Sequence, residues 1–203
     1  MLFRSVMDLV CQDTQLNLSK AYLKPGFAFG GSCLPKDLRA IAYLAKVHDV
    51  NLPMMTSILP SNRVHLDLAF DQILATNKRK IGFVGLSFKT GTDDLRESPL
   101  VALAEKLIGK GCQLGIYDPE VHLARLLGAN RSFIERHLPH VGEMLHPEID
   151  SVMSQSEVII LGSSSAVVQA AVASMLQPEQ ILIDLVRLPQ DSMMAVRAKG
   201  LCW

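Results

Sequence analysis

Residues 80–87, KIGFVGLS, are a short apolar run that ends in glycine and serine. Three more apolar runs follow it along the chain, at 113–117, 158–161 and 181–184. Apolar residues at helical spacing lie between these runs, at 99–109 and 166–176. Strands that alternate with helices are typical of right-handed βαβ units and of a parallel sheet. The sequence therefore predicts an α/β fold here, with ligands bound at the carboxyl ends of the strands.

The chain before residue 79 has helical periodicity instead. Apolar residues at helical spacing predict helices over 1–18, 35–47 and 54–74. Pro60 lies inside the third of these segments, where it either kinks the helix or moves its start to Ser61. We therefore divide the chain into a helical segment, residues 1–78, and an α/β domain, residues 79–203.

The composition is that of a globular protein and argues against a polyanionic partner. Twenty Lys and Arg residues balance twenty Asp and Glu residues, and aromatic residues make up 5% of the chain. A nucleic-acid or anionic-membrane surface needs a basic excess, and a base-stacking surface needs aromatic residues. The uncharged stretch 158–178 is better interpreted as a buried strand and helix than as a membrane span. Without a convincing signal peptide, we expect a cytoplasmic protein that binds neither nucleic acid nor membrane.

The cysteines and histidines do not have the spacing of a metal site. The four cysteines, at 11, 33, 112 and 202, form no C-x-x-C pair, and the six histidines form no H-x-x-x-H pair. Because zinc sites and disulfide frameworks need such spacing, we expect neither. Three of the cysteines are expected to be small buried hydrophobic residues: Cys11, Cys112 and Cys202.

Cys33 differs from the other cysteines in its setting. It follows Gly30 and Gly31 and comes just before Pro35, at a predicted helix start. The helix dipole and the free backbone N–H groups of such a position favour the thiolate, and the glycines let a substrate approach the backbone closely. From the residues alone, covalent catalysis and simple burial are equal alternatives for Cys33.

Two charged residues follow Cys33 on the predicted helix. Lys36 could add a positive field, and Asp37 falls one turn after Cys33 on the same helix face. A carboxylate there could hold a water molecule or accept a proton. A candidate nucleophile, a candidate acid–base residue and glycines that allow a substrate close to the backbone therefore occur within one short segment.

The loop after residue 84 lacks the dinucleotide-binding fingerprint. That fingerprint, G-x-G-x-x-G, follows the first strand of its domain, whereas the corresponding residues here are GLSFKT (85–90), with only the first glycine. A long polar loop continues to Pro99 and carries Lys89 and Arg96. Its charges form either a solvated local network or a ligand contact. The place of the loop at the ligand-binding edge favours contact, with Lys89 meeting a phosphate or carboxylate.

Two segments, GFAFGGSCLPKD (26–37) and SFKTGTDDLRESP (87–99), closely resemble the nucleotide-sugar 6-dehydrogenase family. This family includes enzymes that oxidise UDP-glucose and GDP-mannose. The resemblance covers essentially the whole chain and is greatest to the GDP-mannose branch, partly through the final residues GLCW (200–203). It implies a helical dimerisation segment followed by a Rossmann-like nucleotide-sugar-binding domain, without the N-terminal NAD-binding domain of the family.

The resemblance also implies a reaction. The C6 alcohol of GDP-mannose is oxidised to GDP-mannuronate, a precursor of polysaccharides such as alginate, with NAD as the hydride acceptor. Cys33 corresponds to the cysteine that captures the aldehyde as a thiohemiacetal and then becomes a thioester, and Asp37 to the residue that assists water and proton transfer. The isolated chain is expected to be inactive because the NAD-binding domain is missing.

Further residues acquire roles through the same resemblance. Lys36 and Arg96 match positions that contact NAD, and Lys89 matches a substrate-binding lysine. The nucleotide-sugar loop corresponds to six positions, Tyr22, Lys24, Pro25, Gly26, Phe27 and Gly30. Part of that loop reaches the neighbouring subunit in the family, which implies a homodimer with a shared active site.

Two departures and three alternatives accompany this interpretation. Lys24 replaces an arginine, which removes a planar fork for diphosphate, and Pro60 interrupts a helix that the family runs unbroken. The alternatives are a UDP-glucose 6-dehydrogenase fragment, a non-catalytic nucleotide-sugar-binding and dimerisation module, and an α/β domain in which Cys33 is merely buried.

Overall fold

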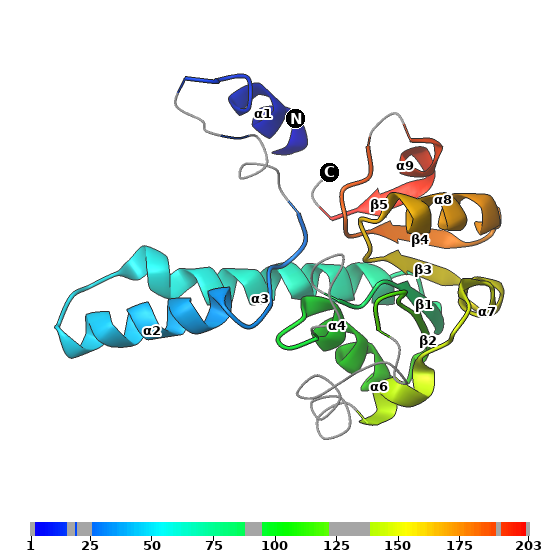
Figure 1. Ribbon diagram of the computed structural model, residues 1–203, viewed down its shortest axis with the longest axis horizontal. Coiled ribbons are helices and arrows are strands. Elements are labelled where there is room, and N and C mark those ends of the chain that lie inside the picture. Colours follow the sequence, from blue (N-terminus) through cyan, green and yellow to red (C-terminus); the bar gives the residue numbers. More distant parts are fainter. Residues whose placement is uncertain are drawn as a thin grey trace.

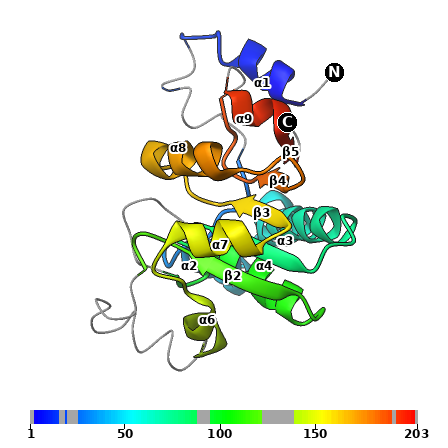
Figure 2. The ribbon, with the colours of Figure 1, turned by 90° about the vertical axis from the view of Figure 1, so that its right-hand side faces the viewer.

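A parallel sheet is at the centre of the structure. The structure is a computed structural model, and it describes residues 3–15, 19, 26–87, 95–121, 139–189 and 192–201. The five strands of the sheet are β1 (Lys80–Val84), β2 (Gln113–Tyr117), β3 (Val158–Leu161), β4 (Ile181–Asp184) and β5 (Ala198–Gly200). All pairs are parallel, in the order β2-β1-β3-β4-β5, which Figure 1 shows from bottom to top. The four strands labelled in Figure 2 follow the same order. The predicted α/β fold class with a parallel sheet is thereby confirmed.

Helices cover both faces of the sheet, as a doubly wound fold requires. The side chains of Ile81 and Phe83 pack on one face against α4 (Pro99–Ile108) and the last turns of α3 (Pro53–Leu74). The side chain of Val84 belongs to the second core, on the other face, with α7 (Ile149–Gln155) and α8 (Ala166–Met175). Strands buried on both faces must be apolar throughout, which is why β1 and β3 read as continuous hydrophobic runs.

The helical segment differs from expectation at two points. The helix predicted over 1–18 ends early, since α1 covers Phe3–Val10 and a turn follows in which the Gln15 N–H donates to Asp13 Oδ1 at 2.9 Å. Such side-chain-to-backbone bonds compete with helix continuation. By contrast, α3 runs through Pro60 as one helix, so the expectation that Pro60 moves its start to Ser61 is wrong. Helix α2 (Leu34–Val47) matches its predicted span closely.

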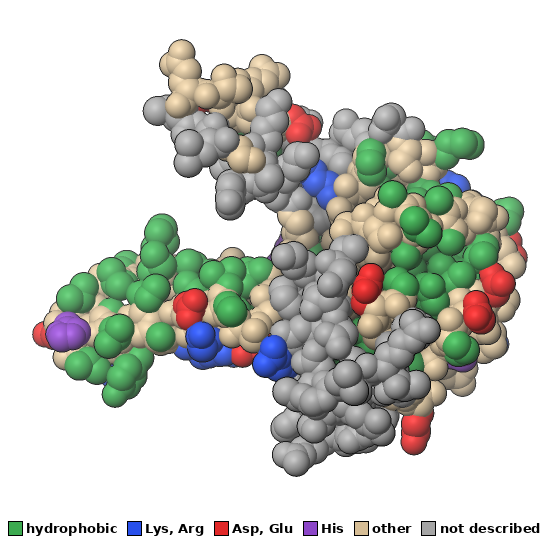
Figure 3. All heavy atoms as spheres, viewed as in Figure 1, with side chains coloured by type: hydrophobic (Ala, Val, Ile, Leu, Met, Phe, Trp, Pro, Cys, Tyr) green, Lys and Arg blue, Asp and Glu red, His purple; other side chains and the backbone are tan. Residues whose placement is uncertain are grey.

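Helices α2 and α3 form an arm that extends away from the sheet (Figure 1). They lie side by side, and the far end of α3 returns to the sheet and leads into β1. Hydrophobic side chains cover much of the arm surface in Figure 3. The exposed large ones are Leu34, Ile41, Tyr43, Leu44, Val47, Val50, Met54, Val64 and Leu68. Among the described residues, no helix is long and apolar enough to cross a membrane.

Four short elements escaped the sequence analysis. They are α6 (Pro139–Met144), α7 (Ile149–Gln155), α9 (Met193–Arg197) and β5 (Ala198–Gly200). Strand β5 has only three residues and none of the branched apolar side chains that mark a strand, so tertiary pairing with β4 creates it.

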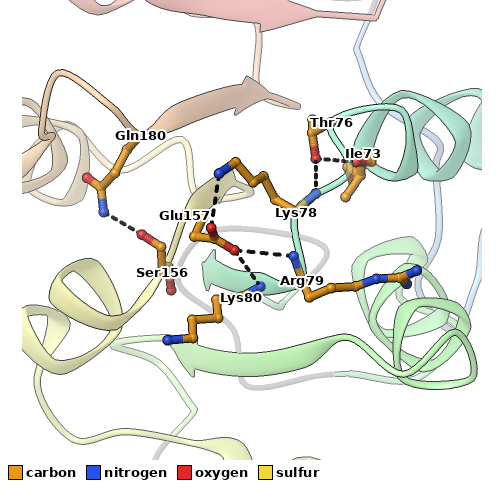
Figure 4. Close-up of polar contacts among 8 residues, drawn as sticks. All are labelled: Ile73, Thr76, Lys78, Arg79, Lys80, Ser156, Glu157 and Gln180. Carbon is orange, nitrogen blue, oxygen red and sulfur yellow. Dashed lines mark hydrogen bonds and ion pairs between the residues drawn. The ribbon is translucent and has the colours of Figure 1, made fainter.

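The junction between α3 and β1 is fixed by one carboxylate from the start of β3. Glu157 accepts hydrogen bonds from Lys78 Nζ at 3.1 Å and from the backbone N–H groups of Arg79 and Lys80 at 3.3 and 3.4 Å (Figure 4). These donors hold the pKa of Glu157 below its usual range. The carboxylate thus ties the end of the arm to the amino-terminal edge of the sheet.

The opposite, carboxyl edge of the sheet is fixed by the buried carboxylate of Asp118. Its Oδ2 accepts the N–H groups of Leu86 and Ser87 at 2.7 and 2.9 Å, and its Oδ1 accepts that of Glu120 at 2.9 Å. Ser98 Oγ donates to the Leu86 carbonyl at 2.8 Å from the start of α4. The turn after β1 is therefore held by β2 and α4 together.

Replacing Asp118 with alanine should lower the free energy of unfolding by about 2–4 kcal/mol, because the N–H groups of Leu86 and Ser87 lose their buried acceptor. Asp71→Ala, at an exposed position on α3, is the control and should change the free energy of unfolding little. Urea unfolding followed by circular dichroism measures both. Equal effects of the two substitutions would contradict the role of Asp118.

Glu157→Gln tests the junction through its pH dependence. Because the pKa of Glu157 is lowered by folding, the carboxylate stabilises the fold at neutral pH, and this contribution is lost as pH falls through the folded-state pKa. We expect a melting temperature about 1–3 °C below the parent at pH 7, converging with the parent below about pH 4. Exposed Glu179→Gln is the control. A difference that persists unchanged at pH 3 would refute the assignment.

Candidate active site

Cys33 lies where the glycine-rich loop enters α2. It is the residue that caps the helix start, its carbonyl accepts the Asp37 N–H at 2.9 Å, and its side chain is exposed. Cys11 and Cys112, by contrast, are buried, as predicted. The alternative of a merely buried Cys33 is therefore wrong. A thiol at this place can be reached by a substrate carbon, next to helix N–H groups that have no partner within the helix.

The charged residues after Cys33 pair with each other. Lys36 Nζ lies 3.4 Å from Asp37 Oδ1, and both side chains are more than half exposed, at 67% and 60%. An exposed ion pair of this kind adds little stability and leaves both groups available to a ligand. The start of α2 therefore presents a thiol, an ammonium and a carboxylate to solvent within one turn.

Two polar side chains of α3 hold the loop that precedes Cys33. Asn62 Nδ2 donates to the Phe29 carbonyl at 2.8 Å, and Asn62 Oδ1 accepts the Phe29 N–H at 2.9 Å. One turn later, His65 Nε2 lies 3.1 Å from the Gly26 carbonyl, and its ring centroid is 5.9 Å from that of Phe27. Sequence analysis missed both anchors. Their spacing of three residues on one helix face was the available signal.

The turn before α4 holds the same loop from the sheet domain. A Cβ atom at Gly30 would overlap the Glu97 carbonyl oxygen and lie 2.7 Å from Pro99 Cδ, so no larger residue fits there. The Glu97 carboxylate pairs with both terminal nitrogens of Arg39 on α2, and this hydrogen bonding raises the pKa of Arg39. Glu97 thus links the turn before α4 to α2.

The described part of the loop lies between two cavities. One, of about 490 Å³, is lined by residues that include Phe27, Met54 and His65. The other, of about 220 Å³, lies among α2, α3 and α4 and includes Arg39 and Glu97. Phe29 and Asn62 line both cavities, so this hydrogen-bonded pair forms the wall between them.

The sheet edge does not fit a dinucleotide pyrophosphate. A pyrophosphate needs free backbone N–H groups in the turn after the first strand, but those of Leu86 and Ser87 are occupied by Asp118. The space beside Gly85, which has φ of +97°, is filled by the backbone of Gly162 and Ser163. Among the described residues, no group of His, Cys, Asp and Glu side chains could hold a metal ion.

The predicted site residues fall into three groups. The structure brings most of the described ones together at the loop and the start of α2, namely Gly26, Phe27, Gly30, Cys33, Lys36 and Asp37. Arg96 lies at the turn before α4, next to Glu97. The remaining predicted ligands, Tyr22, Lys24, Pro25 and Lys89, lie outside the described residues, as does Cys202.

Sequence comparison identifies two domain profiles of one family in the chain. Residues 3–64 match the central domain of the UDP-glucose/GDP-mannose dehydrogenase family. Residues 82–188 match the UDP binding domain of the same family.

Individual relatives agree with these matches. The chain is 49% identical to the GDP-mannose 6-dehydrogenases of Pseudomonas putida and Pseudomonas aeruginosa over 98% of its own length, but it spans only 46% and 45% of theirs. The structure of a ternary complex of the Pseudomonas aeruginosa GDP-mannose dehydrogenase superposes with a TM-score of 0.83 at 48% identity, over 98% of this chain and 45% of that one. A UDP-glucose dehydrogenase from Pyrobaculum islandicum shares the fold, with a TM-score of 0.77 at 22% identity, over 100% of this chain and 44% of that one. On the strength of the two domain matches, this chain belongs to the UDP-glucose/GDP-mannose dehydrogenase family.

Proposed function

We propose that this chain is the part of an NAD-dependent GDP-mannose 6-dehydrogenase that supplies the catalytic cysteine and the nucleotide-sugar-binding domain. The observation that carries the proposal is the exposed thiol of Cys33 at the start of α2, on a loop anchored from two sides. The choice of GDP-mannose rests on the relatives, which are GDP-mannose 6-dehydrogenases at 49% identity. In this proposal residues 1–78 are the central segment and residues 79–203 bind the nucleotide.

Cys33 retains the intermediate between the two oxidations. Its thiolate attacks the C6 aldehyde and forms a carbon–sulfur bond, which gives a thiohemiacetal. The aldehyde oxygen takes up a proton in this step. Transfer of the hydride from that carbon to NAD⁺, with loss of the hydroxyl proton, would give a thioester. Attack by water then breaks the carbon–sulfur bond and releases the carboxylate, a proton and the thiol. An exposed sulfur at a helix start is suited to this chemistry because the adjacent N–H groups can stabilise negative charge.

Asp37 and Lys36 follow Cys33 within about one helical turn, so in this proposal both act near the substrate C6 that bonds to the sulfur. Asp37 follows Cys33 by one helical turn, and its carboxylate is 60% exposed, so it can orient the attacking water. Lys36 and Arg96 are the residues here that would contact NAD. Two NAD⁺ molecules, bound one after the other, would accept the two hydrides.

The nucleotide must be recognised mainly by side chains. Because Asp118 occupies the N–H groups after β1, a diphosphate at this edge needs cations from the flanking loops, and Lys89 is the proposed donor. The loop positions Tyr22, Lys24, Pro25, Gly26, Phe27 and Gly30 complete the proposed sugar site.

A second copy of the chain is the proposed partner. The arm of α2 and α3 exposes large hydrophobic side chains such as Tyr43, Leu44 and Val47, each more than half exposed (Figure 3). An apolar surface of this kind on a folded protein marks an interaction site. A homodimer through the arm would bring the nucleotide-sugar loop of one subunit toward the site of the other.

Isothermal titration of the chain tests the ligand. We expect binding of GDP-mannose or GDP in preference to UDP-glucose, because the relatives at 49% identity act on GDP-mannose. Absence of any nucleotide binding would remove the proposal. Preference for UDP-glucose would move the chain to the other branch of the family. The chain alone should not reduce NAD⁺, because the described residues of the turn after β1, Gly85 to Ser87, have no free N–H groups for a pyrophosphate.

Thiol labelling tests Cys33. In the native chain we expect Cys33 to react roughly tenfold or more faster than Cys11 and Cys112, because it is exposed and they are buried. The labelled positions are identified by mass spectrometry, with Cys33→Ser as the control that should abolish the fast phase. Equal rates at all cysteines of the folded chain would contradict a reactive role. Bound GDP-mannose should slow the reaction by covering the thiol.

A further inference from the structure

We infer that Asn62 of α3 is a positioning residue that fixes the backbone of Phe29 and, through it, the loop that ends at Cys33. The inference rests on the proposed function for its consequence in catalysis, but the positioning itself rests on geometry alone. Asn62 lies far from Cys33 in sequence and carries no chemistry of its own in the proposed reaction.

The two hydrogen bonds of Asn62 use both ends of its carboxamide on one peptide residue. Its Nδ2 donates to the Phe29 carbonyl at 2.8 Å and its Oδ1 accepts the Phe29 N–H at 2.9 Å, across 33 residues of sequence. Asparagine is suited to this pairing, because aspartate lacks the donor and glutamine places the amide one carbon further out. Asn62 therefore bonds both the N–H and the carbonyl of Phe29, as a residue of a paired neighbouring strand does.

The loop needs such external anchors. Residues 26–33 form no helix or strand, and three of them are glycines, of which Gly31 has φ of +85°. Glycine-rich backbone loses much conformational entropy when it is ordered. Asn62 from α3 and the Glu97 backbone from the sheet domain contact the adjacent residues Phe29 and Gly30, so neither contact alone defines this segment.

The position of the cysteine depends on this anchor. Cys33 is only four residues after Phe29, at the point where the loop becomes α2. If Phe29 is released, the lining that the two cavities share is altered, and the backbone that leads into Cys33 loses one of its anchors. Binding and attack geometry that are set before the substrate arrives favour both affinity and rate.

Hydrogen exchange with mass spectrometry on the full chain tests the anchor directly. In Asn62→Ala the backbone around Phe29 should exchange roughly fivefold to tenfold faster, because its N–H loses its acceptor. Asn62→Asp keeps an acceptor for this N–H but turns its other oxygen toward the Phe29 carbonyl, so it should restore only part of the protection. Asn51→Ala removes an exposed amide just before α3 and is the control. Unchanged exchange of peptides from β3 in every variant verifies that the sheet remains folded.

Titration with GDP-mannose measures the consequence for the site. Asn62→Ala should weaken binding by roughly fivefold or more, Asn62→Asp by less, and Asn51→Ala not at all. If Asn62→Ala leaves the exchange of residues 26–33 unchanged, or if Asn51→Ala has the same effect, the positioning role is overturned. If the parent chain binds no nucleotide sugar, the proposed function fails, and the exchange result still decides the role of Asn62. Should Asn62→Ala fail to fold, Asn62→Gln replaces it, because its longer side chain misplaces the same amide.

Discussion

The contact between the backbone of Gly30 and the carbonyl of Glu97 joins the two halves of this protein at the site. Only a residue without a Cβ atom fits there, and the Glu97 carboxylate adds a two-pronged pair with Arg39 on α2. The loop of residues 26–33 thus contacts the turn before α4 as well as helix α3 of the arm. These contacts fix the loop that leads into Cys33 relative to the turn before α4.

The carboxyl edge of the sheet combines a Rossmann-like strand order with a turn after β1 whose described N–H groups are bonded within the protein. Its strand order places the turns after β1 and β3 next to each other, where such folds bind ligands. Here Asp118 occupies the N–H groups of Leu86 and Ser87, and Gly162 fills the space beside Gly85. The N–H groups of the described residues after β1 are therefore bonded within the protein, and in the proposed function a nucleotide is bound mainly by side chains of the loops. This agrees with the absence of the G-x-G-x-x-G pattern in the turn after β1.

The core elements could be predicted because their signals are local. Strands β2, β3 and β4 occupy the predicted residues, since a strand buried on both faces must be apolar at every position. The errors have equally physical causes. Helix α3 tolerates Pro60, whereas α1 stops early at an Asx turn, and β5 exists only because β4 provides a pairing edge. None of these outcomes follows from the apolar pattern of the segment itself.

The sequence by itself determined the parallel α/β fold and singled out Cys33, because periodicity, glycines and a helix start are encoded within a few residues. Only the tertiary structure decided what holds Cys33 in place. Asn62, His65 and Glu97 act on partners that are 33, 39 and 58 residues away along the chain. Which side chain meets which backbone group at such separations depends on how the helices pack against the sheet. No local pattern of residue types contains that information.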